Sequence, residues 1–221
     1  MGRMKKRLNT YIFYVLGLII AALGNTLMIK AALGQAPFNA MNYNISMVTG
    51  LKIGDIGILF NILFMALQIL ILRRDFQWLQ LLQLVPGFIS GKFLNLFMYD
   101  LPVTAAITPG SYPSALFVFL CGQCVSALGI SLVTSADVIA FPCESLCKAL
   151  TGKTRLSFRF YRTMCDVSFL AAALTIMLFI GNTNSIREGT VINMLLTGTL
   201  IDFLNRKLCE KYIYRPAGRT P

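Results

Sequence analysis

Six long apolar stretches constrain this chain more than any other feature of its sequence. Each is close to the about 20 apolar residues that a helix needs to cross the hydrocarbon core of a bilayer. They are residues 11–33, 54–72, 78–99, 113–136, 160–181 and 187–205. Hydrophobic residues make up 56% of the chain and charged residues 13%, whereas soluble domains contain about 45–50% and roughly 25%. We therefore expect an all-α, polytopic membrane protein with six transmembrane helices.

The distribution of Lys and Arg residues predicts how these helices are oriented. A net charge of +11 could indicate a nucleic-acid-binding protein, so the placement of that charge decides the partner. Of these residues, 15 lie at the two ends of the chain and in the second and fourth loops, against 2 at the other three loops, namely Lys52, and Arg187 at the start of the sixth span. The positive-inside rule then predicts that residues 1–10 and 206–221 are basic cytoplasmic ends. We expect the lipid bilayer, and no nucleic acid, as the partner.

The two halves of the chain resemble each other, which indicates an internal repeat. The matched pairs are Gly17 and Gly122, Ala21 and Ser126, Gly24 and Gly129, Pro37 and Pro142, and Asn61 and Asp166 at an offset of 105, then Gly91 and Gly198, and Asn95 and Asp202 at an offset of 107. Each half, residues 11–105 and 106–205, contains three spans. Because three is odd, the second half must enter the membrane from the opposite side, which makes the repeat inverted.

A proline-led connector follows the first span of each half. The connectors cover about residues 34–53 and 137–159, and the inversion places the first on the outer face and the second on the inner face. Gly34, Pro37 and Pro142 are therefore candidate helix breaks and gates. Each connector is either a partly re-entrant helix or an amphipathic helix on the membrane surface. The helix N-termini after the prolines would suit an anionic group, and the polar side chains beside them are Asn39, Asp137 and Glu144.

The residues around the first proline also resemble a known group. The matching strings are Gly24 with residues 30–39 (KAALGQAPFN), residues 49–54 (TGLKIG), and the Gly-x-x-x-Asn/Asp ending of each half. They resemble the YczE/YyaS/YitT superfamily of bacterial membrane proteins over roughly residues 11–205. The resemblance implies a bacterial inner-membrane protein with transport as a candidate role, and no reaction. Family members often carry an acidic residue where this chain has Asn39.

Small residues one helical turn apart let two membrane helices approach closely. We expect such residues to pack helices within the chain, with dimerisation as the alternative. They are Gly17, Ala21, Gly24, Gly87, Gly91, Gly122, Ser126, Gly129 and Gly198.

Polar side chains inside the spans are the main candidates for a solute path, because an ionised group at mid-membrane costs about 2.5–3.5 kcal/mol. The hypothesis is that a path between the halves is lined by Asn61, Lys92, Asn95, Asp166 and Asp202. For Asp166 and Asp202 the alternative is a structural role, either an interhelical hydrogen bond or a carboxylate at the end of a span. For Lys92 the alternative is that its long side chain extends to the lipid headgroups. Lys30 is a further path candidate, and it has the same alternative because it lies nearer the outer end of its helix. For the carboxylates of the second connector, the alternative is that they balance nearby Lys and Arg charges.

These features favour a secondary transporter or channel-like carrier of a small polar or ionic solute. The alternatives are a non-transporting assembly or regulatory factor, or a solute-binding subunit energised by a separate ATPase, so a homodimer or a partner membrane protein is also considered. The chain has no His, the commonest general base, and we expect neither an enzyme nor a cofactor. Cys121-x-x-Cys124 lies inside a span without a second pair, so no metal site is expected, and the six cysteines should stay reduced.

Overall fold

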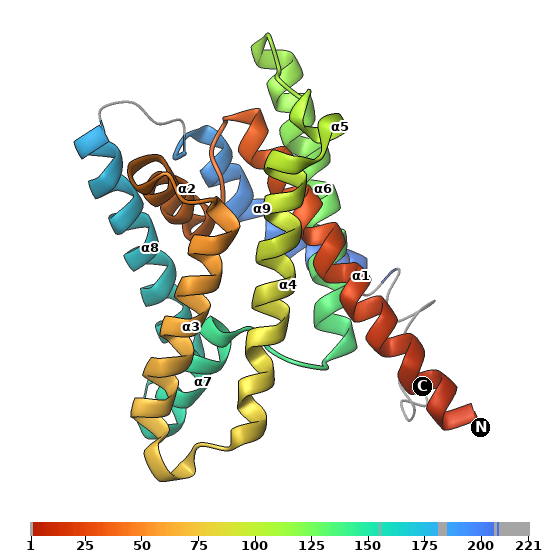
Figure 1. The fold of residues 1–221 in the computed structure, drawn as a ribbon, viewed down its shortest axis with the longest axis vertical. Coiled ribbons are helices and arrows are strands. Elements are labelled where there is room, and N and C mark those ends of the chain that lie inside the picture. The colour runs from red at the N-terminus through yellow and green to blue at the C-terminus, as the bar shows by residue number, and fades with distance from the viewer. Residues whose placement is uncertain (1, 155, 181–184, 206, 208–221) are drawn as a thin grey trace.

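The computed structural model describes residues 2–154, 156–180, 185–205 and 207, with side chains described from residue 9 onward except at residue 105. Within these ranges the chain is helical, with no strand (Figure 1). The elements are α1 (Gly2–Ala31), α2 (Pro37–Thr49), α3 (Ile53–Leu72), η1 (Arg73–Asp75), η2 (Trp78–Gln83), α4 (Leu84–Asn95), η3 (Leu96–Asp100), α5 (Pro102–Ala105), α6 (Tyr112–Ala136), α7 (Pro142–Lys153), α8 (Phe158–Ile180) and α9 (Glu188–Leu204). The basic tail predicted over 206–221 lies outside the described residues apart from Lys207.

Five helical segments of the described chain are long and apolar enough to cross a membrane, in agreement with a polytopic membrane protein. They are Asn9–Ala31, Ile53–Asp75, Trp78–Asp100, Tyr112–Ala136 and Phe158–Ile180. The sixth expected span forms α9, which has 17 residues. At 1.5 Å per residue α9 is about 26 Å long, slightly less than the roughly 30 Å of the hydrocarbon core.

Both connectors form helices that begin at the predicted prolines. Pro37 and Pro142 occupy the first turns of α2 and α7, where a proline needs no hydrogen-bond partner for its missing N–H. Gly50 ends α2 in the left-handed conformation, with its N–H donating to the Ser46 carbonyl oxygen at 2.9 Å. The local sequence is therefore sufficient to explain where these two short helices start, and where α2 stops.

Gly34 lies in the turn between α1 and α2, and this turn packs against the start of α9. Its φ of 108° is accessible to glycine, and a Cβ there would lie 2.8 Å from the Thr190 backbone nitrogen. Next to it, the Gly189 N–H donates to the Leu33 carbonyl oxygen at 2.8 Å, and the Gln35 N–H donates to Thr190 Oγ1 at 3.2 Å. Gly34 is thus required both by the turn and by the close approach of α9.

The most extensive helix contact of the described chain joins α1 to α6, which cross each other in Figure 1. A Cβ at Gly24 would lie 2.6 Å from Ser126 Cα, and one at Gly129 would lie 2.7 Å from Ala21 Cα. A Cβ at Gly17 would lie 2.9 Å from the Gly129 oxygen, and one at Gly122 would lie 2.9 Å from the Gly24 oxygen. The two helices therefore touch backbone to backbone, and each contact has a counterpart at the matched positions of the other helix.

Two further sets of helix contacts are reciprocal between the halves, whereas the contact of α3 with α4 has no comparable α8–α9 counterpart among the described residues. Helix α2 packs on α8 while α7 packs on α3, and α4 packs on α1 while α9 packs on α6. In Figure 1, α2 and α7 lie at opposite ends of the group formed with α3 and α8. The four helices share one apolar core of Ala40, Met41, Phe64, Cys143, Leu146, Phe169 and Ala173. Helix α9 is held to α6 by buried amides, with Asn193 Nδ2 donating to Gln123 Oε1 at 2.7 Å.

Candidate functional site

A cavity of about 630 Å³ lies between α1, α2, α3, α4, α6, α7 and α8. Its size is within the about 300–1,000 Å³ that is usual for small-molecule sites. Four asparagines from three helices line it, namely Asn25 of α1, Asn39 and Asn42 of α2, and Asn61 of α3. The site is therefore assembled from segments of the chain that lie close together only after folding.

The asparagine side chains are the polar part of the cavity wall. Asn42 is 2% exposed, and its Oδ1 has no hydrogen-bond partner among the described residues. Asn25 Oδ1 accepts a hydrogen bond from Ser126 Oγ at 3.2 Å. Asn61 fits against Gly87, where a Cβ would lie 2.6 Å from Asn61 Nδ2. Gly87 is thus needed to make room for an asparagine that lines the cavity.

Most of the remaining wall is apolar, as is usual for a site that binds a small molecule. Apolar side chains from α1, α2, α3, α4, α6 and α8 line it, namely Leu18, Phe38, Ile53, Leu94, Ile130, Val133 and Phe169. The cavity can therefore contact both the apolar and the polar parts of a solute, and its amides can donate or accept hydrogen bonds.

Charged side chains of both signs also line the cavity, and they come from α7, α8 and the end of α6. They are Asp137, Glu144, Lys148 and Arg162. Glu144 and Lys148 form an ion pair at 3.2 Å, one helical turn apart, with side chains 43% and 59% exposed. Because these charges are largely exposed while the asparagines Asn42 and Asn61 are buried, the charges mark the accessible part of the wall.

The structure brings some of the sequence-predicted site residues to this cavity. Asn39, Asn61, Asp137 and Glu144 line it, as do Ala21, Gly87 and Gly91 among the predicted packing residues. Pro37 and Pro142 are buried and start the helices that carry Asn39 and Glu144. Lys30 lies in the last turn of α1 and is not part of the cavity wall.

The hypothesised path of five polar residues is not brought together. Lys92 Nζ pairs with Asp55 Oδ1 at 2.8 Å, with both side chains substantially exposed. Asn95 Oδ1 accepts a hydrogen bond from the Gly54 N–H at 2.8 Å. Both α4 residues therefore bind the start of α3, and only Asn61 of the five lines the cavity.

The two aspartates of that hypothesis also lie elsewhere. Asp166 Oδ1 lies 3.4 Å from Arg162 of its own helix. Asp202 lies in a separate depression on α9 with Leu195, Gly198, Thr199 and Phe203. A Cβ at Gly198 would meet no described atom within 4 Å, so the packing role expected for this glycine finds no partner in the described chain. The offset relates equivalent positions in the two halves, and equivalence alone does not place their side chains in one site.

Sequence reasoning missed Asn25, Asn42, Ser90, Lys148 and Arg162, which also line the cavity. A signal for Asn42 was available, because it follows the candidate Asn39 by three residues and so shares its helix face. Arg162 lies at the start of the fifth predicted span, so its charge was also an available signal. It lines the cavity only because α8 packs on α7.

Comparison with known proteins agrees with the membrane assignment. The model of a family of unknown function (DUF6198) matches residues 8–206. The chain is 29% identical to "Uncharacterized membrane protein YczE" of Bacillus subtilis (strain 168), over 94% of this chain and 91% of that protein. It is 26% identical to "Uncharacterized protein YyaS" of the same organism, over 86% of this chain and 90% of the relative. No solved structure matches. The apolar helices and the similarity to YczE show that this is a membrane protein, and the chain belongs to the DUF6198 family.

Proposed function

We propose that the protein is a secondary transporter or channel-like carrier that binds a small polar or ionic solute in the cavity between its helices, within the bacterial inner membrane. The observation that carries this proposal is the buried asparagine wall, and above all Asn42. A buried acceptor without a partner costs about 1–3 kcal/mol, and such groups are rare in folded proteins. Asn42 lines a cavity large enough for a solute, and its buried Oδ1 is such an acceptor. Rotation of the Asn42 amide toward the cavity would let water or a solute satisfy it.

The chemistry of the wall indicates which solutes would fit. The amides bind uncharged polar groups without the desolvation cost of a buried charge, and the apolar side chains favour a solute with a hydrocarbon part. The charged groups on the accessible part of the wall, Glu144, Lys148 and Arg162 among them, carry both signs. A small solute that combines polar and apolar groups is therefore the best match.

Movement of such a solute requires the cavity to open alternately to the two faces, and the proposed inverted repeat provides for this. In this proposal α9 is the sixth span, both termini are cytoplasmic, and the halves rock against each other about the α1–α6 crossing. The reciprocal pairs α2 with α8 and α7 with α3 support the repeat. So do the matched close contacts of Gly17 and Gly24 on α1 with Gly129 and Gly122 on α6.

Uptake into proteoliposomes tests the proposal. The protein is reconstituted and exposed to an isotopically labelled bacterial metabolite extract, and the vesicle contents are analysed by mass spectrometry. We expect at least one solute to enter faster than into empty vesicles. An Asn42→Ala variant should weaken its uptake at subsaturating concentration about 10-fold, because one lost hydrogen bond of about 1–1.5 kcal/mol corresponds to roughly that factor.

Asp202→Asn is the matched control, because Asp202 lies on α9 apart from the cavity. It should transport like the unmodified protein. The proposal fails if no solute crosses faster than through empty vesicles, or if Asn42→Ala and Asp202→Asn transport equally well.

A further inference from the structure

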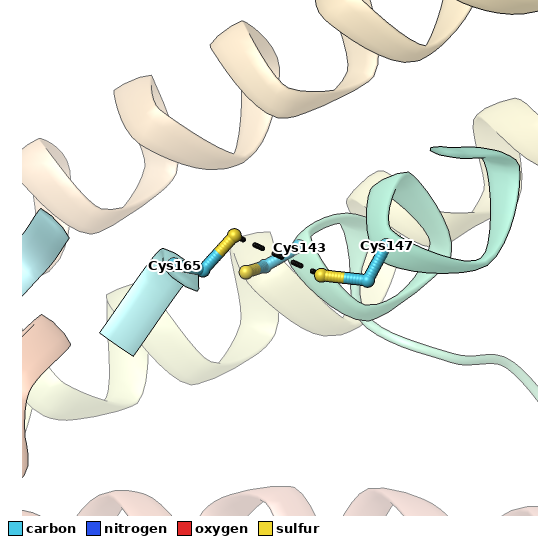
Figure 2. Close-up of side chains that lie close together, drawn as sticks. All are labelled: Cys143, Cys147 and Cys165. Atoms are coloured by element: carbon cyan, nitrogen blue, oxygen red, sulfur yellow. Dashed lines mark hydrogen bonds between the residues drawn. The ribbon is translucent and has the colours of Figure 1, made fainter. Parts of the chain in front are cut away.

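Three cysteines that are separated in the sequence converge where α7 packs on α8. Cys143 and Cys147 lie four residues apart on α7 and therefore on the same face, and Cys165 comes from α8. The three sulfur atoms all lie within 4.8 Å of one another, and the Cys147 and Cys165 Sγ atoms are 3.7 Å apart. Figure 2 shows the three side chains directed toward a common point.

The spacing of the sulfurs matches that of metal-bound thiolates. A zinc–sulfur bond is about 2.3 Å long, so two thiolates on a tetrahedral ion lie about 3.8 Å apart. The 3.7 Å between Cys147 and Cys165 is close to this value, and the third sulfur is near enough to complete the set with a small side-chain adjustment. Cys147 is fully buried and Cys143 is 9% exposed. Two of the three sulfurs are therefore well shielded from competing ligands in water.

We propose that Cys143, Cys147 and Cys165 bind one thiophilic divalent metal ion of the zinc class. Three thiolates and a divalent ion carry a net charge of −1, and Arg162, which also pairs with Asp166, places a positive charge beside them. Its Nη1 lies 3.7 Å from Cys143 Sγ, a charge-assisted contact to that thiol. A zinc ion takes four ligands, and because Cys143 also lines the cavity, water there can supply the fourth.

The metal ion would fasten α7 to α8 at the edge of the cavity. Helix α7 carries Glu144 and Lys148, and α8 carries Arg162, so the bound ion holds three of the charged wall residues in one arrangement. Thiolate ligands of this kind are available only in a reducing compartment, which agrees with the cytoplasmic side expected for this connector.

The ionisation of the thiols indicates how binding would depend on pH. Burial raises the pKa of Cys143 to about 12 against the opposing charge of Arg162, and burial also raises the pKa of Cys147 to about 11. Because only thiolates bind the ion, binding releases protons and tightens as the pH rises.

Cadmium titration tests this inference, because cadmium binds thiolates like zinc and gives an ultraviolet sulfur-to-metal absorption. The protein in detergent is titrated with Cd²⁺ under reducing conditions, in a Cys209→Ser background, so that the thiol outside the described residues does not contribute. We expect about one ion per chain, displacement by Zn²⁺, and loss of the absorption in Cys147→Ser and in Cys165→Ser. An Arg162→Gln variant should bind about 10–100-fold more weakly, as is usual for loss of an outer-shell partner.

A Cys121→Ser/Cys124→Ser variant is the matched control, since both thiols are exposed on α6 and separate from the cluster. It should bind Cd²⁺ like the background protein. Thermal unfolding without metal shows which cluster variants fold. If Cys147→Ser does not fold, Cys165→Ser is used instead, because Cys165 is partly exposed and its replacement perturbs the packing less. The inference is overturned if the absorption persists in a folded Cys165→Ser variant. It is equally overturned if mild oxidation yields a Cys147–Cys165 disulfide in a protein that binds no Cd²⁺.

Discussion

Replacing Gly24 by alanine should weaken the α1–α6 crossing by an amount that the structure allows us to work out. The new Cβ would lie 2.6 Å from Ser126 Cα and 2.7 Å from the Gly122 oxygen. Carbon atoms need about 3.5 Å, and the Ser126 nitrogen lies closer still, so the two helices must separate by at least about 0.9 Å. The clashing atoms belong to backbone and cannot rotate away. Overpacking of this kind costs typically about 1–3 kcal/mol.

The measurement is the midpoint of thermal unfolding in detergent, with Gly198→Ala as the matched control. Both changes add one methyl group to a helix and gain up to about 1 kcal/mol of helix propensity, but a Cβ at Gly198 meets no described atom within 4 Å. The difference between the two variants therefore isolates the clash. At about 2–4 °C per kcal/mol for a chain of this size, Gly24→Ala should unfold about 2–12 °C below Gly198→Ala.

The contacts of Gly129 mirror those of Gly24, which gives a second variant with the same expected effect. A Cβ at Gly129 would lie 2.7 Å from Ala21 Cα and 2.6 Å from the Gly17 oxygen, nearly the same distances as at Gly24. Gly129→Ala should therefore lower the midpoint by a similar amount. The double variant should lose less than the sum, because one separation of the helices relieves both clashes. Equal midpoints for Gly24→Ala and Gly198→Ala would refute the close approach and this reasoning with it.

Three further outcomes are expected. Asn95→Ala should destabilise the protein by about 1–3 kcal/mol, measured by thermal unfolding, because it leaves the buried Gly54 N–H without its acceptor; an unchanged midpoint would contradict this role. Lys92→Gln should change stability by at most about 1 kcal/mol, since its ion pair with Asp55 is largely exposed, and a larger loss would show that the pair is structural. Single cysteines introduced at the C-terminal ends of α2 and α7 in a cysteine-free chain should react with a membrane-impermeant maleimide from opposite faces of the bilayer. Reaction from the same face would disprove the proposed inversion.

The positions of helices and helix breaks could largely be predicted from the sequence. Runs of apolar residues predicted the long helices, and Pro37 and Pro142 predicted where the connectors begin, because a proline fits the first turn and disrupts later ones. The candidate site was predicted less well. Asn39 and Asn61 lie at the cavity, whereas Asn95 accepts a hydrogen bond from a backbone N–H of α3.

What the sequence by itself determined is local: which segments are apolar, where they break, and which small residues permit close packing. What only the tertiary structure decided is which faces meet, because that depends on how α2 crosses to α8 and how α7 crosses to α3. Cys143 and Cys165 are 22 residues apart along the chain, and only the packing of α7 on α8 brings their sulfurs within 4.8 Å. Hydrophobicity sets the membrane depth of a residue, whereas the rotation and crossing of each helix set its neighbours, and these are collective properties of the packed helices.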